Sequence, residues 1–345
     1  MEFNNSKANN FWKNHTLDEF QILNILKNVQ KYSVDSVCFL KDGRIASSSD
    51  LDNNVLIYNK ITFQIEIRIY EKSGVHYMNI NKDGILILCL IDTFIDLYEI
   101  KWKKYKIIQV IKPYSLFYDI IGKFDHSFSI LKFIELKNGD IAFLVWAYAI
   151  CFYKKKKNTK KYSYLNKFSE KRDENTTDIC EINNNQYCIS LRYNKAIKFL
   201  DMNSKKITKI INLNFYFSDS HNQFLLMNET DLFVSGQKSI CIIDIQQKEI
   251  IKIIDLINVN GYLSSIYKLP NNIIIAGFWA NYIQQLEYDE IKKELRIISE
   301  IKGKKRETSD LFNIKSLSIF NNKLIVSTYD NKIDPSSLIV YKLKN

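Results

Sequence analysis

The sequence predicts an all-β chain built from seven copies of one four-stranded antiparallel unit. Three observations predict it. A turn pair ahead of a short apolar strand recurs along the 345 residues at intervals of 41 to 55 residues. Four short strand-like runs fall in each interval. The last run of a unit is more polar than the middle runs, which indicates that each unit is layered from the inside of the molecule outward.

Each unit is anchored by a turn pair of small polar residues or Gly. Asn-Gly and Asp-Gly between apolar runs are strong hairpin signals, because a tight primed turn needs positive φ at both central residues. Asn tolerates such angles better than most residues, so we expect it to replace Gly in a chain with only 9 Gly and 3 Pro. The seven pairs are Asp42-Gly43, Asp83-Gly84, Asn138-Gly139, Asn184-Asn185, Thr230-Asp231, Asn271-Asn272 and Asn321-Asn322.

The first and fifth units show the four strands most clearly. The third run of the fifth unit is continuously apolar, as a strand covered on both faces is. The last run of the first unit instead alternates apolar and polar residues, as a half-exposed outer strand does. The strands expected are 37–40, 45–49, 55–59 and 62–69 in the first unit and 224–227, 232–235, 239–244 and 249–254 in the fifth.

The two ends of the chain together complete one unit. The seventh unit ends with its third strand at 337–342, and residues 19–25 alternate like an outer strand. An N-terminal strand that completes the last blade closes the ring and removes an exposed strand edge. We therefore expect a flexible N-terminal segment at 1–18 and a single seven-bladed β-propeller of four-stranded antiparallel blades at 19–345. The third blade is the least regular, and a count one higher or one lower stays open.

In these features the chain resembles the WD-repeat β-propeller family over residues 19–345. The resemblance rests on the segment 42–52 and on third strands that end at 57–59, 97–99, 199–201 and 243–244. No Trp-Asp dipeptide and no Gly-His pair that opens a blade occurs, so the Asp-His-Ser-Trp hydrogen-bond tetrads of that family are largely absent. The resemblance implies a non-catalytic interaction scaffold that presents the top face of the ring to a protein or peptide partner.

Motifs for catalysis or cofactor binding are missing from the sequence. There is no H-E-x-x-H, no G-x-S-x-G and no glycine-rich phosphate loop, and none of the four His stands at metal-ligand spacing from another ligand. The six cysteines lie singly in apolar runs, so we expect reduced, buried thiols and neither metal nor cofactor. Asp50 and Asp52 are expected to cap their own turn. A propeller enzyme that uses channel carboxylates is the weakest alternative.

No targeting or membrane-spanning segment is visible. The N-terminus lacks a basic run followed by an apolar stretch, so it does not resemble a secretory signal. The longest uncharged stretch, at 141–153, has 13 residues, against about 20 for a membrane-spanning helix. We therefore expect an intracellular, cytoplasmic protein without a transmembrane segment.

Aromatic and arginine side chains gather at the turns between second and third strands. In a propeller these turns share the top face with the connections between blades, including the long connection at 112–127. Trp, Tyr and Arg dominate binding hot spots, because they bury a large rigid area and keep a polar group. In the alternative interpretation the rings pack between blades. The predicted partner-binding residues are Trp146, Tyr148, Arg192, Tyr193, Trp279, Tyr282 and Tyr329.

The formal charge of +11 comes from three lysine-rich segments, at 101–106, 154–161 and 302–306. The first two are hairpins between third and fourth strands of neighbouring blades, so both belong to the bottom face of the ring. Such a patch attracts nucleic acid or an anionic membrane lipid. In the alternative interpretation these lysines are solvated loop tips. The candidate anion-binding residues are Lys101, Lys103, Lys104, Lys154, Lys155, Lys156, Lys157, Lys160 and Lys161.

Overall fold

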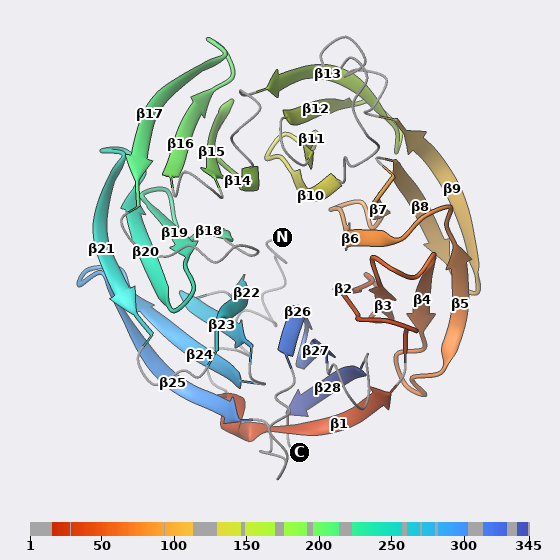
Figure 1. Cartoon of the computed structure of the whole chain (residues 1–345). Coiled ribbons are helices and arrows are strands. Elements are labelled where there is room, and N and C mark those ends of the chain that lie inside the picture. Colours follow the sequence, from red (N-terminus) through yellow and green to blue (C-terminus); the bar gives the residue numbers. More distant parts are fainter. Residues whose placement is uncertain are drawn as a thin grey trace.

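The strands of the protein form seven four-stranded antiparallel sheets around a central axis (Figure 1). Each sheet is one blade, so the predicted seven-bladed propeller is confirmed. The computed structural model describes residues 16–27, 29–92, 94–112, 130–145, 149–169, 176–191, 196–213, 223–256, 261–269, 271–279, 282–302, 313–329 and 337–343.

Six blades follow one another along the chain, each with its first strand innermost and its fourth strand outermost (Figure 1). Blade 1 has β2 (Ser36–Phe39), β3 (Ile45–Ser48), β4 (Asn54–Tyr58) and β5 (Ile65–Tyr70). Blade 2 has β6 (Val75–Ile80), β7 (Leu86–Leu90), β8 (Ile95–Lys101) and β9 (Lys104–Ile111). Blade 3 has β10 (Ile130–Glu135), β11 (Ile141–Val145), β12 (Ala149–Lys155) and β13 (Tyr162–Ser169).

The next three blades repeat this order. Blade 4 has β14 (Thr176–Asn183), β15 (Gln186–Leu191), β16 (Ala196–Asp201) and β17 (Lys206–Asn212). Blade 5 has β18 (Phe224–Leu226), β19 (Asp231–Ser235), β20 (Ser239–Asp244) and β21 (Glu249–Asp255). Blade 6 has β22 (Leu263–Lys268), β23 (Ile273–Phe278), β24 (Tyr282–Asp289) and β25 (Glu294–Lys302).

Blade 7 closes the ring by joining the two ends of the chain. It combines β26 (Asn313–Phe320), β27 (Lys323–Tyr329) and β28 (Ser337–Leu343) with β1 (Phe20–Lys27) as its outer strand. The two terminal strands pair antiparallel from Phe20 opposite Leu343 to Lys27 opposite Ser337. The predicted closure by an N-terminal strand is therefore confirmed.

The packed part of the ring extends slightly beyond the expected boundary at residue 19. A short 3-10 helix, η1 (Leu17–Glu19), precedes β1. Leu17 is fully buried, and its N–H donates to Gln285 Oε1 and Ser299 Oγ of blade 6, at 2.9 Å each. Residues 1–15 lie outside the described part of the chain, so the flexible segment stays a prediction there.

The hydrophobic core is divided among the junctions between blades. The described residues form seven buried apolar clusters, and each cluster joins two neighbouring blades. The middle strand β20 is buried almost throughout, whereas the outer strand β5 alternates between buried and exposed residues. The expected gradient of polarity from the inside outward is therefore present, and burial between blades holds the ring together.

In blades 1 to 3, the turns between first and second strands differ from the primed turns expected, whereas Asn271 and Asn272 of blade 6 both have the positive φ expected. In blade 1, Leu40 N–H donates to the carbonyl of Arg44 at 2.8 Å, which leaves three residues in the loop, and only Gly43 has positive φ, +85°. Blades 2 and 3 repeat the pattern. Three-residue loops of this kind use one left-handed residue after a type I turn. Asn takes the left-handed angle at Asn185, Asn271, Asn272 and Asn321, as expected.

One strand begins later in the structure than the sequence pattern predicted. The alternating run at 62–69 was expected to be a single strand, but β5 begins at Ile65. Phe63 has φ of 58°, and its N–H donates to the carbonyl of Asn59 within the preceding turn. Alternation alone does not distinguish a turn residue from a strand residue, so the boundary depended on an angle that the pattern does not encode.

Candidate functional site

Two faces of the ring carry the loops. All seven blades have the same strand order and antiparallel pairing. Connections between blades and between second and third strands therefore lie on one face, the top. Turns between first and second strands and hairpins between third and fourth strands lie on the other face, the bottom.

Most of the predicted partner-binding residues fall outside what the structure describes, and so does the connection at 113–129. Trp279 and Tyr282 are described, both in blade 6. The side chains outside the described part are those of Trp146, Tyr148, Arg192, Tyr193 and Tyr329.

The two described rings pack against other aromatic rings. Trp279 is half-buried and lies edge-on to Tyr262, with ring centroids 5.7 Å apart. Tyr282 is buried beside Phe278. Tyr282 belongs to the apolar cluster between blades 5 and 6, as the alternative interpretation expects, whereas the ring partner of Trp279 lies in the same blade. The partner-binding role of the seven residues stays a prediction.

The top face exposes apolar side chains that sequence reasoning missed. Leu51 is 61% exposed on the turn between β3 and β4, and Tyr32 is exposed on the connection into blade 1. Ile91 of blade 2 and Tyr262 of blade 6 are exposed on equivalent connections. Isolated apolar residues in loops carry no periodic signal, so only the fold places them on one face.

The backbone under Tyr32 and Leu51 is held by side chains of blade 1. Asp52 Oδ2 accepts from the N–H groups of Lys31 (2.7 Å) and Tyr32 (3.3 Å). The Asp50 N–H donates to Asp35 Oδ2 at 2.9 Å. The expectation that Asp52 caps its own turn was therefore wrong, because its carboxylate instead binds the preceding connection. The capping role expected of Asp50 stays a prediction.

Two pairs of carboxyl groups lie near this face. Burial, with the adjacent Asp35, raises the pKa of Asp50 to about 6. On the connection from blade 1 to blade 2, burial raises the pKa of Glu71 to about 7, with a contribution from Asp96 of β8. Each pair therefore holds a proton more tightly than isolated carboxyl groups do.

Charged groups on the innermost strands are engaged with one another. Lys132 Nζ of β10 lies 2.7 Å from Asp178 Oδ1 of β14, and the Phe224 N–H of β18 donates to Asp178 Oδ2 at 2.7 Å. Burial alone would lower the pKa of Lys132, but the Asp178 carboxylate raises it. Asp178 thus joins blades 3, 4 and 5, and both of its oxygens are occupied.

The bottom face carries the lysine-rich hairpins. Residues 101–106 span the turn from β8 to β9, and 154–161 span the turn from β12 to β13, so the predicted placement on neighbouring blades is confirmed. Glu99 Oε1 pairs with Lys160 at 2.5 Å and with Lys101 at 3.3 Å, and Lys155 pairs with Asp83. Glu99 and Asp83 lie outside the basic runs in sequence, and the fold places them beside lysines of these hairpins. Most of the third segment, residues 303–306, lies outside the described residues.

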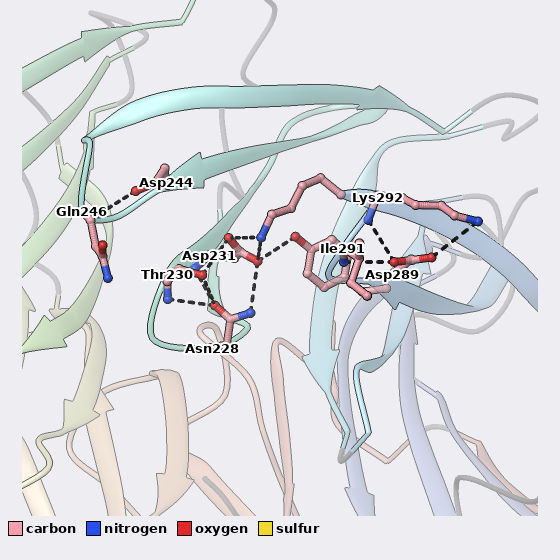
Figure 2. A network of polar contacts seen from close by, with 10 residues as sticks. Asn228, Thr230, Asp231, Asp244, Gln246, Asp289, Ile291 and Lys292 are labelled. Carbon is pink, nitrogen blue, oxygen red and sulfur yellow. Dashed lines mark hydrogen bonds and ion pairs between the residues drawn. The ribbon is translucent and has the colours of Figure 1, made fainter.

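A buried ion pair fixes the bottom of blade 5 to blade 6. Figure 2 shows Asp231 in contact with Asn228 and Thr230 of its own turn and with two side chains of the next blade. Lys293 Nζ lies 2.6 Å from Asp231 Oδ2, and the Tyr288 hydroxyl donates to the same oxygen at 2.8 Å. Burial alone would raise the pKa of Asp231, but the bonds from Lys293, Tyr288 and Asn228 hold it below its usual range.

The described residues contain no group of three or more His, Cys, Asp or Glu side chains placed to hold a metal ion. All six cysteines are free thiols, five of them buried. Burial raises the pKa of Cys38 to about 12, which keeps its thiol protonated and unreactive. The one helix in the described ranges, η1, has three residues, so no helix there is long enough to cross a bilayer.

Comparisons with known proteins identify the fold. No family model matches the chain, and no curated protein matches its sequence. Solved structures match along 94% of this chain. The WD40 β-propeller domain of Doa1 has a TM-score of 0.68 at 13% identity over 97% of its length. U3-55K and the WD40 repeats of RRP9 each have 0.69 at 11% identity over 98%. A chain of the mitotic checkpoint complex has 0.66 at 11% over 95%. The protein therefore has the WD40 β-propeller fold.

Proposed function

We propose that the protein is a non-catalytic scaffold that binds a protein or peptide partner on the top face of its ring. The observation that carries this proposal is the pair of exposed apolar side chains, Tyr32 and Leu51, on backbone held by Asp52 and Asp35. Rigid, partly apolar surfaces lose little entropy on binding, which favours association. Membership of one similar propeller in the mitotic checkpoint complex supports a role of this kind by analogy of fold.

The proposal includes the predicted residues of the same face. In sequence, Trp146, Arg192 and Trp279 directly follow the second strands of their blades, and we expect them to extend this surface around the central axis. The ionic groups on the innermost strands support a non-catalytic role, because Asp178 is occupied by Lys132 and by a backbone donor. We further propose a cytoplasmic location.

Affinity capture from the native cell tests the proposal. The tagged wild-type chain is compared with a Tyr32→Ser, Leu51→Ser variant. The control is Ile291→Ser, which changes a still more exposed apolar residue on the bottom face. We expect the top-face variant to lose the proteins that the wild type and the control retain. Equal capture by all three folded proteins would contradict the proposal.

A second variant tests the residues predicted from the sequence. Replacing Trp146, Arg192 and Trp279 with Ala should abolish partner capture while the chain stays folded, as judged by its melting curve. If the triple variant unfolds instead, these side chains belong to the core and the partner surface is limited to the other exposed residues.

A further inference from the structure

The hairpins of blades 1, 2 and 3 form a continuous arc on the bottom face. They are the turns from β4 to β5, from β8 to β9 and from β12 to β13. Arg44 of blade 1 donates to the carbonyl of Trp102 on the blade 2 hairpin. Lys160 of the blade 3 hairpin pairs with Glu99 of blade 2 at 2.5 Å. These contacts fix the blade 2 hairpin against blade 1 and the blade 3 hairpin against blade 2.

The hairpins of blades 2 and 3 in this arc carry a strong excess of positive charge. The segments 99–106 and 154–161 contain ten lysines and one acid, Glu99. Glu99 is shared by Lys101 and Lys160, and Lys155 is paired with Asp83. The matching hairpins of blades 4, 5 and 6, at 201–206, 244–249 and 289–294, contain five lysines and six acids. The positive potential is therefore limited to one half of the bottom face. No ion pair within the described residues engages the side chains of Lys103, Lys104, Lys106, Lys154, Lys156, Lys157 and Lys161.

Large apolar side chains project from the same arc. Trp102 is 84% exposed and Ile61 is 75% exposed, each at the tip of its hairpin. Water-exposed side chains of this size gain free energy when an apolar phase covers them. Their position at the tips, among the lysines, allows both kinds of group to meet one surface at the same time.

Trp102 occupies a position that local structure does not favour. Lys101 pairs with Lys104, so Trp102 and Lys103 form the turn, and Trp102 has φ of 49°. A bulky residue at positive φ is uncommon, and Asn or Gly is the usual choice in such a turn. In the matching hairpins of other blades, positive φ is found at Phe63, Asn158, Lys205, Lys248 and Lys293, and the aromatic residue among them, Phe63, is buried. A residue that breaks the local preference without packing against the protein points to a role outside the fold.

Lysine side chains together with exposed Trp and Ile match a membrane surface better than a nucleic acid. Basic residues are attracted to anionic lipid headgroups, and Trp lies at the boundary between headgroups and acyl chains. The aliphatic Ile61 has no face on which a base can stack, as nucleic-acid interfaces require. Arg44 is the arginine of the arc, and its side chain is largely buried in contacts with Asp42 and Glu66.

We propose that the arc formed by the hairpins of blades 1, 2 and 3 docks the ring onto an anionic lipid bilayer. Trp102 and Ile61 enter the interfacial layer, and the surrounding lysines bind the headgroups. The ring then lies with its bottom face on the membrane, and its top face points into the aqueous phase.

Flotation of the full-length chain with lipid vesicles tests this proposal. The probe is phosphatidylcholine vesicles with and without about 30% phosphatidylserine, at about 0.1 and 0.5 M salt. We expect binding to the anionic vesicles alone and a steep loss at the higher salt. Ile61→Ser with Trp102→Ser should weaken binding about tenfold or more. Replacing Lys154, Lys156, Lys157 and Lys161 with Gln should abolish binding to the anionic vesicles.

The matched control is Ile291→Ser, because Ile291 is 94% exposed at the tip of the blade 6 hairpin, on the near-neutral half of the same face. It should bind as the wild type does. A Trp102→Phe variant should keep binding but lose quenching of its fluorescence by brominated lipid. Unchanged melting curves verify that all variants are folded.

Three results would overturn the proposal. The first is no binding to anionic vesicles. The second is vesicle binding that survives the loss of Ile61 and Trp102 and depends on the lysines alone, which is simple charge adsorption. The third is tight, salt-sensitive binding of single-stranded RNA with no binding to vesicles, which would assign the arc to nucleic acid.

Discussion

At the scale of single residues, the carboxyl groups of Glu71 and Asp96 show how the fold changes ordinary chemistry. Glu71 Oε1 and Asp96 Oδ1 are buried and have no hydrogen-bond donor among the described residues. A proton shared between them would satisfy both oxygens. The pKa of Glu71 is raised to about 7 by burial first, against a hydrogen bond from Tyr98, with Asp96 adding to the rise. The charged form of this pair therefore disfavours the folded state.

Replacing Glu71 with Gln should stabilise the protein at pH 8 but not at pH 5. A raised folded-state pKa contributes stability below the unfolded pKa, and that contribution is lost as pH rises through about 7. Gln cannot ionise, so the loss does not occur. We expect a gain of about 1 kcal/mol at pH 8, since Glu71 is only partly buried. Urea unfolding at both pH values measures it, with Glu290→Gln at an exposed position as the control. A gain of equal size at pH 5 would contradict this explanation.

At the scale of the strands and turns, each blade is fixed to the next by more than apolar packing. Asp178 joins three innermost strands, and Asp231 joins the bottom of blade 5 to the hairpin of blade 6. Figure 2 shows how many donors converge on the Asp231 carboxylate. Such a buried carboxylate is stable only while its partners stay in place, so these contacts set how blades align as well as how tightly they pack.

Neighbouring lysines of one hairpin provide a test of this contact. Lys293→Met removes the cation beside the fully buried Asp231, whereas Lys292→Met removes an exposed lysine 3.9 Å from Asp289. We expect Lys293→Met to lower the free energy of unfolding by about 2–3 kcal/mol and Lys292→Met to change it by less than about 0.5 kcal/mol. Chemical denaturation measures both. Similar effects of the two substitutions would show that the blade junction does not depend on the Asp231 pair.

The N-terminal strand β1 closes the ring by pairing with β28. Deleting residues 1–27 removes β1, exposes the edge of β28 and takes Leu17 and Phe20 out of a buried cluster. Deleting residues 1–14 leaves β1 intact. We expect the shorter deletion to unfold cooperatively, like the full chain, and the longer one to aggregate or lose cooperativity. Calorimetry and size-exclusion chromatography distinguish the outcomes. A longer deletion that stays monomeric and melts normally would show that closure contributes little.

At the scale of the whole molecule, the sequence predicted what repeats and missed what depends on distant partners. The strands of blades 1 and 5 and the closing strand follow from apolar patterns and turn pairs. The partner of Asp52 is about twenty residues away, and Lys293 is 62 residues from Asp231. No spacing rule connects such residues, because only the ring brings them together. The basic hairpins were placed correctly. The sequence did not predict the contacts that Glu99 and Trp102 make with the neighbouring blades.

If one ring carries two independent binding faces, substitutions on each face should affect only the binding at that face. Partner capture and anionic vesicle binding are compared for the wild type, for Tyr32→Ser with Leu51→Ser, and for Ile61→Ser with Trp102→Ser. We predict that the first variant loses the captured partner and keeps vesicle binding, and that the second does the reverse. Loss of both activities in either folded variant, or of neither in both, would contradict the claim.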